Sequence, residues 1–187
     1  PFSSIQGNVL GYHEYNLGKA SKDELQRYLE MQPDVYAITW SPDEQTAAYV
    51  VGDVHSWEGQ MHLWHLGQDT PVAVELVHRI TDFYWSPDST HVLVDIGTSA
   101  TRFGEVINRQ TGSKIASFMY MSSAIWSPDS KKIVYGDINE AVQFSVALEL
   151  MGTVDVKILN LETGQEEVIY QGTPDDYFVP TEWTLFE

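Results

Sequence analysis

Trp40-Ser41-Pro42-Asp43 recurs twice along the chain, as Trp85-Ser86-Pro87-Asp88 and as Trp126-Ser127-Pro128-Asp129, at spacings of 45 and 41 residues. Each copy lies between two short stretches rich in β-branched and aromatic residues, a pattern typical of strands. Serine accepts a hydrogen bond at the first position of a type I turn, proline fixes φ at the second, and aspartate suits the third. The repeat therefore predicts three hairpins, each with a tryptophan that is available to pack against the next sheet.

A second motif recurs in the same frame. Asn108-Arg109-Gln110-Thr111-Gly112 matches Asn160-Leu161-Glu162-Thr163-Gly164, and β-prone residues flank both copies. This pattern predicts a second hairpin with a glycine-containing turn. Each unit then has four strands, and the third unit carries about 11 additional residues, which fall within residues 138–152.

The two ends of the chain resemble parts of the same unit. Residues 13–19 resemble residues 62–68, the late half of a unit, and residues 176–186 resemble a first strand, with Trp183 as its tryptophan. We expect complete blades at residues 35–78, 79–121 and 122–172, and a closing blade built from residues 1–19 and 176–187. Closure of this kind removes the sheet edges that promote aggregation.

One segment predicts a helix. Ser21 and Glu24 have the spacing of a capping box, Leu25 and Leu29 fall on one face, and Pro33 ends the segment. Residues 140–150, inside the insertion, are compatible with a second helix, although their valine and phenylalanine content also suits a strand.

Together these motifs resemble the TolB-type, WD-like β-propeller repeat family over residues 35–170. The resemblance implies an all-β fold: a small β-propeller of about four blades, three of them complete and four-stranded and one closed by the N- and C-terminal segments, with one short N-terminal helix. Family members usually have glycine after the aspartate, where this chain has Glu44, Ser89 and Ser130, and we expect this departure to affect only the turn. Propellers of this type commonly have six or seven blades. A compact four-bladed ring, a half-propeller completed by a second copy, and a part of a longer propeller are therefore three open alternatives.

The composition narrows the classes of partner and compartment. With 27 Asp and Glu against 10 Lys and Arg, the formal net charge is −17, which disfavours nucleic acid and anionic membrane surfaces. The sequence has no run of about 18 apolar residues that predicts a transmembrane helix. It also has no cysteine, which excludes disulfides, thiolate metal sites and cysteine catalysis. The lack of cysteine, and a start at Pro1 without a signal stretch, favour an extracytoplasmic protein (cell surface or periplasm) whose targeting segment was removed; a cytoplasmic protein is the alternative.

The resemblance also implies where a ligand would bind. In the family, the connections between second and third strands and between blades surround the central channel, on the face opposite the Ser-Pro-Asp turns. The residues that we expect there as ligand or partner contacts are Asp53, His55, Trp57, His78, Arg79, Asp82, Asp95, Asp137, Asp175 and Tyr177. We expect a negative face that takes a protein or a small polar or carbohydrate ligand, and a homodimer is a further alternative.

Two classes of function follow. The chain has no Gly-x-Ser-x-Gly elbow, so we expect a non-catalytic binding or protein-interaction module without a required cofactor. Asp53, Asp95 and Asp137, at the exits of three blades, are candidate calcium ligands, against the simpler interpretation that they are solvated loop carboxylates. The competing function is a hydrolase acting on carbohydrate or peptide, with acids or the pair His55 and His78 at the central channel.

Overall fold

The Trp-Ser-Pro-Asp segments fold as the tight turns that their sequence predicts. A computed structural model of the protein describes residues 17–53, 55, 58–98, 101–121, 123–138, 153–173 and 180–183. In the first turn, the Ser41 hydroxyl donates to the Asp43 carboxylate at 2.6 Å and accepts the backbone N–H of Thr46 at 3.0 Å. Ser86 and Ser127 make the same two kinds of hydrogen bond in the other turns. All three serines are buried, so protein groups rather than water fix each hairpin.

The described residues form three four-stranded antiparallel sheets. The first sheet consists of β1 (Val35–Trp40), β2 (Thr46–Asp53), β3 (Glu58–His65) and β4 (Val72–His78). The second consists of β5 (Ile80–Trp85), β6 (His91–Thr98), β7 (Thr101–Asn108) and β8 (Lys114–Tyr120). The third consists of β9 (Ala124–Trp126), β10 (Lys132–Ile138), β11 (Val154–Asn160) and β12 (Glu166–Tyr170). Within each sheet the strands are paired in chain order, as the repeat predicts for a propeller blade.

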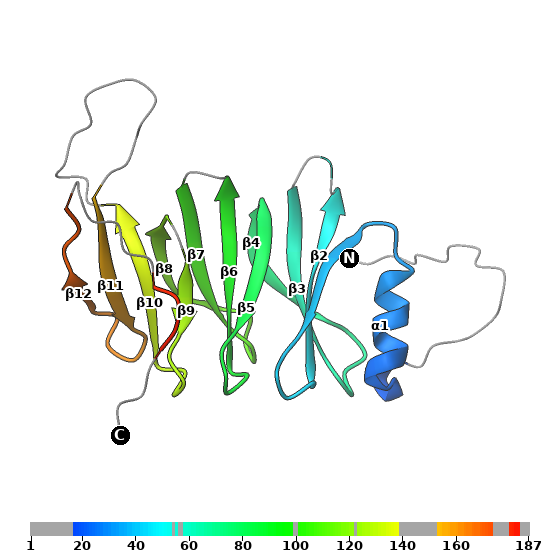
Figure 1. The fold of residues 1–187 in the computed structure, drawn as a ribbon. Helices are drawn as coiled ribbons and strands as arrows, with labels where there is room; N and C mark the ends of the chain where they lie inside the picture. The colour runs from blue at the N-terminus through cyan, green and yellow to red at the C-terminus, as the bar shows by residue number, and fades with distance from the viewer. Residues whose placement is uncertain are drawn as a thin grey trace.

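The three sheets stand side by side, with the Ser-Pro-Asp turns at one end and the connections between second and third strands at the other (Figure 1). Side chains alternate between the two faces of a strand. Val92 and Val94 of β6 therefore join a core cluster with the first sheet, and Leu93 joins a second cluster with the third sheet. Face-to-face packing of four-stranded antiparallel sheets is the architecture of a β-propeller, so the expected fold class, an all-β small propeller, is confirmed.

A helix covers the side of the first sheet that faces away from the second. Helix α1 (Lys22–Glu30) follows the short 3-10 helix η1 (Leu17–Lys19). The capping box is confirmed, because the Ser21 N–H donates to the Glu24 carboxylate at 2.8 Å and the Ser21 hydroxyl oxygen accepts the Glu24 N–H at 3.4 Å. Leu25 and Leu29 are fully buried against a cluster that includes Trp64. The helix thus stands where another sheet stands in the rest of the row (Figure 1).

The repeat tryptophans pack against the element that precedes their own sheet, not the one that follows it. Trp126 is 8% exposed and belongs to the cluster between the second and third sheets. Trp85 is half-buried against the cluster between the first and second sheets. Trp40 is also half-buried, but the element that precedes its sheet is helix α1, so it packs in the cluster formed with that helix.

The residues after the three aspartates have a larger role than expected. Glu44, Ser89 and Ser130 all adopt the left-handed conformation, with φ of 59°, 63° and 60°. The hydroxyl oxygen of Ser89 accepts the N–H of Asp43 from the first sheet at 3.0 Å, and that of Ser130 accepts the N–H of Asp88 from the second sheet, also at 3.0 Å. The expectation that these residues affect only the turn is therefore wrong, because the two serines join neighbouring sheets.

The predicted closing blade and insertion fall largely outside the described residues, which do not include 1–16, 139–152, 174–179 or 184–187. Closure of the ring within one chain, its alternatives, and the second helix thus stay predictions. Residues 180–183 are described and lie beside β9. There the Ser123 hydroxyl donates to the carbonyl of Pro180 at 2.6 Å, and the Trp183 indole N–H donates to the carbonyl of Ile125 at 3.1 Å.

Candidate functional site

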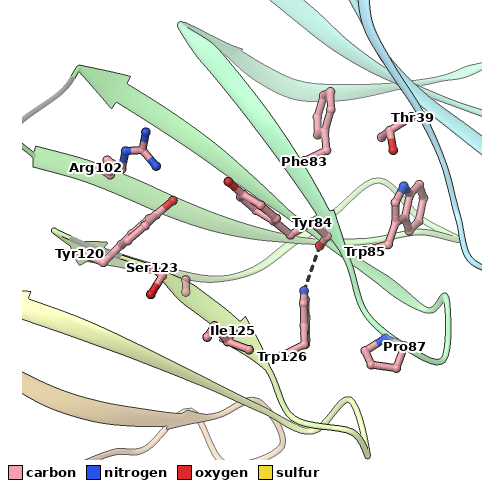
Figure 2. Close-up of a pocket in the computed structure, with 11 residues that line it drawn as sticks. Thr39, Phe83, Tyr84, Trp85, Pro87, Arg102, Tyr120, Ser123, Ile125 and Trp126 are labelled. Atoms are coloured by element: carbon pink, nitrogen blue, oxygen red, sulfur yellow. Dashed lines mark hydrogen bonds between the residues drawn. The ribbon is translucent and has the colours of Figure 1, made fainter. Parts of the chain in front are cut away.

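A pocket of about 620 Å³ is lined mainly by residues in and next to β5 and β9, with further residues from β1, β7 and β8 (Figure 2). Its volume is within the range of small-molecule sites. Strands β1, β5 and β9 each begin a sheet and are paired on one side only, so their other edges are turned toward the pocket. The lining residues are Thr39, Phe83, Tyr84, Trp85, Pro87, Arg102, Tyr120, Ser123, Ala124, Ile125 and Trp126.

Aromatic side chains form much of the pocket wall. Tyr84 lies in the middle of the pocket in Figure 2 and is 37% exposed. On one side of it, Trp126 donates its indole N–H to the backbone carbonyl of Tyr84 at 2.9 Å. This bond links the third sheet to the backbone of β5, and it holds the flat face of Trp126 in place. Rigid aromatic rings of this kind supply large contact areas at a low cost in conformational entropy.

Trp85 differs from the other repeat tryptophans in its hydrogen bonding. Its indole N–H is buried and has no hydrogen-bond partner among the residues that the structure describes. In the same position, Trp126 donates to the second sheet and Trp183 donates to the third. Strand β1, which Trp85 faces, is irregular: its pairing with β2 shifts between Tyr36 and Thr39. A buried donor without an acceptor is costly, so this part of the pocket has an unused hydrogen-bond donor.

A buried ion pair forms the charged end of the pocket. Asp95 of β6 is 1% exposed, and its carboxylate pairs with the Arg102 guanidinium at 2.9 Å. The Arg102 side chain is 36% exposed, so the guanidinium reaches the pocket while the carboxylate lies beneath it. Burial opposes the charge of Arg102, but Asp95, Tyr120 and Tyr84 together outweigh this effect and raise the pKa of Arg102. The guanidinium is thus a permanent donor at a fixed position.

Two tyrosine hydroxyls lie close to this ion pair. Tyr120 is 1% exposed, and burial, followed by the charge of Asp95, raises its pKa far above the usual value. Burial and the charges of Asp82 and Asp95 also raise the pKa of Tyr84, whose hydroxyl donates to Asp82 at 3.3 Å. Both hydroxyls therefore stay protonated. With Arg102, they give this end of the pocket hydrogen-bonding groups beside a wall of aromatic rings.

The three acids predicted at the strand exits lie on β2, β6 and β10, toward the end of the sheets opposite the Ser-Pro-Asp turns (Figure 1). Each has different surroundings. Asp53 is exposed and accepts the N–H of His55 at 2.9 Å. Asp95 is buried under Arg102, and Asp137 is half-buried beside the ammonium group of Lys157. In the described ranges, no group of three or more His, Asp or Glu side chains is arranged to hold a metal ion.

The other predicted contacts are distributed over the same end of the protein. His55 is exposed between β2 and β3, and Arg79 is exposed between β4 and β5. His78 ends β4, with its backbone opposite Gly59, but the position of its side chain is not described. Asp82 is exposed on β5 and reaches the pocket through its bond with Tyr84. The predicted contacts that lie outside the described residues are Trp57, Asp175 and Tyr177.

The sequence reasoning missed most of the residues that line the pocket. The sequence predicts packing roles for Trp85 and Trp126, and it gives no functional signal for Tyr84 and Tyr120, because a tyrosine in a strand is ordinary. One available signal was position: Tyr84 and Ile125 immediately precede the repeat tryptophan. In a propeller this places them on the innermost strand, next to the central channel.

Solved structures with this architecture are β-propellers. The β-propeller domain of the Trilobed protease from Pyrococcus furiosus, described as having an open velcro topology, matches with a TM-score of 0.54 and 18% identity over 74% of this chain and 44% of its own. A eukaryotic initiation factor matches with a TM-score of 0.53 and 14% identity over 74% of this chain and 32% of its own. The acylaminoacyl peptidase of Pyrococcus horikoshii matches with a TM-score of 0.52 and 17% identity over 74% of this chain and 25% of its own. At these identities the likeness concerns the fold alone.

This chain spans less than half the length of each of these three structures. A scan of protein-family models and a search of curated proteins both find no match. Among the described residues, no helix is long and apolar enough to cross a membrane. The three packed sheets and the matches to solved structures together show that the protein has a β-propeller fold.

Proposed function

We propose that this chain is a non-catalytic binding module of the TolB-type, WD-like propeller family, and that it binds its ligand in the pocket along β1, β5 and β9. One observation supports this most strongly: aromatic rings and a single arginine line the same pocket. Tryptophan, tyrosine and arginine are the residue types that dominate binding energy at protein interfaces. The three repeated Trp-Ser-Pro-Asp turns, which occupy equivalent positions in three sheets, support the assignment to the family.

The part of the ligand that enters the pocket is uncharged and polar. Asp95 neutralises Arg102, and Asp82 adds a further negative charge beside Tyr84. The protein as a whole carries a net charge of −17, so a free anion is repelled. Hydroxyl or amide groups match the donor Arg102 and the acceptor oxygen of Tyr84, and a flat apolar face matches the rings of Trp126 and Tyr84. Sugars and peptide segments both have these two properties.

The exposed residues at the strand exits are proposed to extend the same site. Asp53 ends β2, and His55 and Arg79 lie on connections at the end where the channel opens in a propeller. We propose that these three residues contact the outer part of a larger ligand or a partner protein. An extracytoplasmic location agrees with a cysteine-free sequence.

Two-dimensional NMR of the indole N–H groups tests the pocket directly, because each of the six tryptophans gives one signal. The probes are maltose, cellobiose, chitobiose, and tripeptides blocked at both ends by acetyl and amide groups. We expect the signals of Trp85 and Trp126 to move on titration, while those of Trp40 and Trp64, outside the pocket, stay unchanged. Tyr84→Ala should weaken the binding of any active probe by about tenfold, as for a central interface residue.

Ile169→Ala provides the matched control. Ile169 is 51% exposed on β12, away from the pocket, so its truncation should leave the affinity unchanged. Shifts at Trp40 and Trp64 without shifts at Trp85 and Trp126, or equal effects of the two alanine variants, would contradict a site in this pocket. Turnover of a probe during the titration would favour the hydrolase instead.

A further inference from the structure

The second and third sheets are joined by two hydrogen bonds of opposite direction, and the bond made by the turn recurs between the first and second sheets. The later sheet donates through its tryptophan: the Trp126 indole N–H bonds to the Tyr84 carbonyl of the second sheet at 2.9 Å. The earlier sheet donates through its turn: the Asp88 N–H bonds to the Ser130 hydroxyl oxygen of the third sheet at 3.0 Å. Each sheet therefore has a leading side, which carries the tryptophan, and a trailing side, which carries the carbonyl and the aspartate N–H.

Helix α1 covers the leading side of the first sheet, and it provides an acceptor and a donor at the places where the trailing side of a preceding sheet would provide a carbonyl and an aspartate N–H. The Trp40 indole N–H, equivalent to that of Trp126, donates to the side-chain oxygen of Gln26 at 2.6 Å. Glu44, equivalent to Ser130, pairs with Lys22 at 2.6 Å. Leu25 of the helix is fully buried on the same surface. The helix thus satisfies the hydrogen-bonding groups and the apolar surface that another sheet would otherwise satisfy.

Residues 180–183 occupy the trailing side of the third sheet in a complementary way. The Trp183 indole N–H donates to the carbonyl of Ile125, which is the residue immediately before Trp126. This is the bond that Trp126 itself makes one sheet earlier, to the carbonyl immediately before Trp85. Trp183 thus presents to the third sheet the group that a following sheet would present.

We propose that the two covered sides fit each other, so that the partner of this surface is a second copy of the same chain. The first sheet of one copy would replace residues 180–183 on the third sheet of another. Trp40 then donates to the carbonyl of Ile125, and the Asp129 N–H, equivalent to that of Asp88, meets the carboxylate of Glu44. Helix α1 and the Trp183 segment are the intramolecular occupants that keep single copies apart.

The resulting contact is head-to-tail, because the two surfaces are different. Such an interface uses one side of each copy and leaves the other free, so it continues into longer assemblies or closes into a ring. An occupant tethered to the same chain has a high effective concentration and competes strongly with a free copy. Weakening the tethered occupants should therefore convert single copies into assemblies in a concentration-dependent way. This inference concerns surfaces outside the pocket and is independent of the proposed ligand.

The test uses the full chain with helix α1 displaced by Leu25→Asp and Leu29→Asp, and with Trp183→Ala added in a second variant. Sedimentation velocity over a concentration series measures the average mass. The helix variant should show at least a twofold rise in average mass with concentration, and the combined variant a larger rise at lower concentration. A synthetic peptide of residues 17–32, added in excess, should return the mass of the helix variant to that of a single copy. Circular dichroism first identifies samples that keep the β signal.

Cross-linking separates the specific contact from general aggregation, because the natural chain has no cysteine. In the helix variant, Glu44→Cys with Asp129→Cys should form disulfides between copies, whereas Glu44→Cys with Glu162→Cys, at an exposed turn of the third sheet, should not. Equal cross-linking of the two pairs, or a folded helix variant whose mass stays that of a single copy, would overturn the proposal. If the double aspartate variant does not fold, Gln26→Ala with Lys22→Ala replaces it, and a mass independent of concentration then has the same consequence.

Discussion

Replacing Ser130 with alanine should destabilise the protein through one hydrogen bond between sheets. The Ser130 side chain is 4% exposed, and its oxygen accepts the Asp88 N–H at 3.0 Å. Alanine keeps a Cβ, so the energetic cost of the left-handed φ of 60° is retained. The loss of the bond costs about 1 kcal/mol, and incomplete hydration of the freed N–H raises this to about 1–2 kcal/mol. For a chain of this length, each kcal/mol lowers Tm by about 2–4 °C.

Glycine at the same position separates the hydrogen bond from the backbone conformation. Ser130→Gly loses the same bond but relieves a left-handed conformation that costs an ordinary residue about 1–2 kcal/mol. Part of that relief, about 0.5–1 kcal/mol, is offset by the greater freedom of glycine in the unfolded chain. The expected stability is therefore within about 0.5 kcal/mol of the natural protein, clearly above that of Ser130→Ala.

Glu44 provides the matched control, since its φ is 59° and its carboxylate pairs with Lys22 and not with a second sheet. Exposed ion pairs contribute about 0–1 kcal/mol, so Glu44→Ala should cost less than Ser130→Ala, and Glu44→Gly should be neutral or stabilising. Urea unfolding gives the stabilities, and hydrogen exchange reports the Asp88 amide directly. The reasoning is refuted if Ser130→Ala is no more destabilising than Glu44→Ala, or if exchange at Asp88 is unchanged in Ser130→Ala.

Three further outcomes are expected. Trp126→Phe keeps most of the packing but loses the hydrogen bond to the Tyr84 carbonyl. It should lower the free energy of unfolding in urea by about 1–2 kcal/mol, whereas Trp126→Ala should lower it by about 3–5 kcal/mol. A Trp126→Phe variant as stable as the natural protein would mean that the indole N–H contributes nothing. Arg102→Met leaves the 1% exposed Asp95 carboxylate unpaired and should lower the free energy of unfolding by about 3–5 kcal/mol. Asp95→Asn leaves an arginine that water can reach, so it should lower the free energy of unfolding by less. If Asp95→Asn were the more destabilising variant, the burial argument would be wrong. Stability should fall in two stages as the solution is acidified. Burial lowers the pKa of His62 and His91, so their contribution to stability is lost as the pH drops below about 6.5. Hydrogen bonds from Ser127 and Lys131 lower the pKa of Asp129, so its contribution is lost below about pH 4. Ser127→Ala should weaken only the second stage of this acid titration, and a stability that rises on acidification would contradict both assignments.

The fold was predictable because its local signals are strong and repeated. A serine, a proline and an aspartate at consecutive positions determine a turn almost without help from the rest of the chain, and three copies in one frame imply three similar sheets. The capping box at Ser21 and Glu24 is equally local and is found as expected. The packing partner of the helix was not predictable in the same way. Gln26 and Lys22 bond to Trp40 and Glu44, and nothing in the helix sequence identifies those partners.

The candidate site was predictable only in part, because its groups come from different strands. The sequence indicates Asp95 as an acid at a strand exit, but the burial of its carboxylate depends on Arg102, which lies on the next strand of the same sheet. Parity along a strand also matters: Asp95 shares the face of Leu93, toward the third sheet, whereas Asp137 shares the face of Tyr135, toward the second. A one-residue difference in position after the turn reverses the face. Counting acids near strand exits therefore cannot tell which of them converge.

The opposite directions of the two hydrogen bonds between sheets bear on how such a chain changes over evolution. Duplication or loss of one whole repeat brings an aspartate N–H opposite a serine hydroxyl at each new junction, as at both junctions between the three sheets, and a tryptophan donor opposite a carbonyl, as between the second and third sheets. A genetic event that begins and ends at the same point of the frame thus creates no unmatched surface, even when loop lengths differ, as the spacings of 45 and 41 residues illustrate. Unequal recombination between the repeated segments is consequently tolerated at this level, and the number of repeats can drift while each junction stays the same.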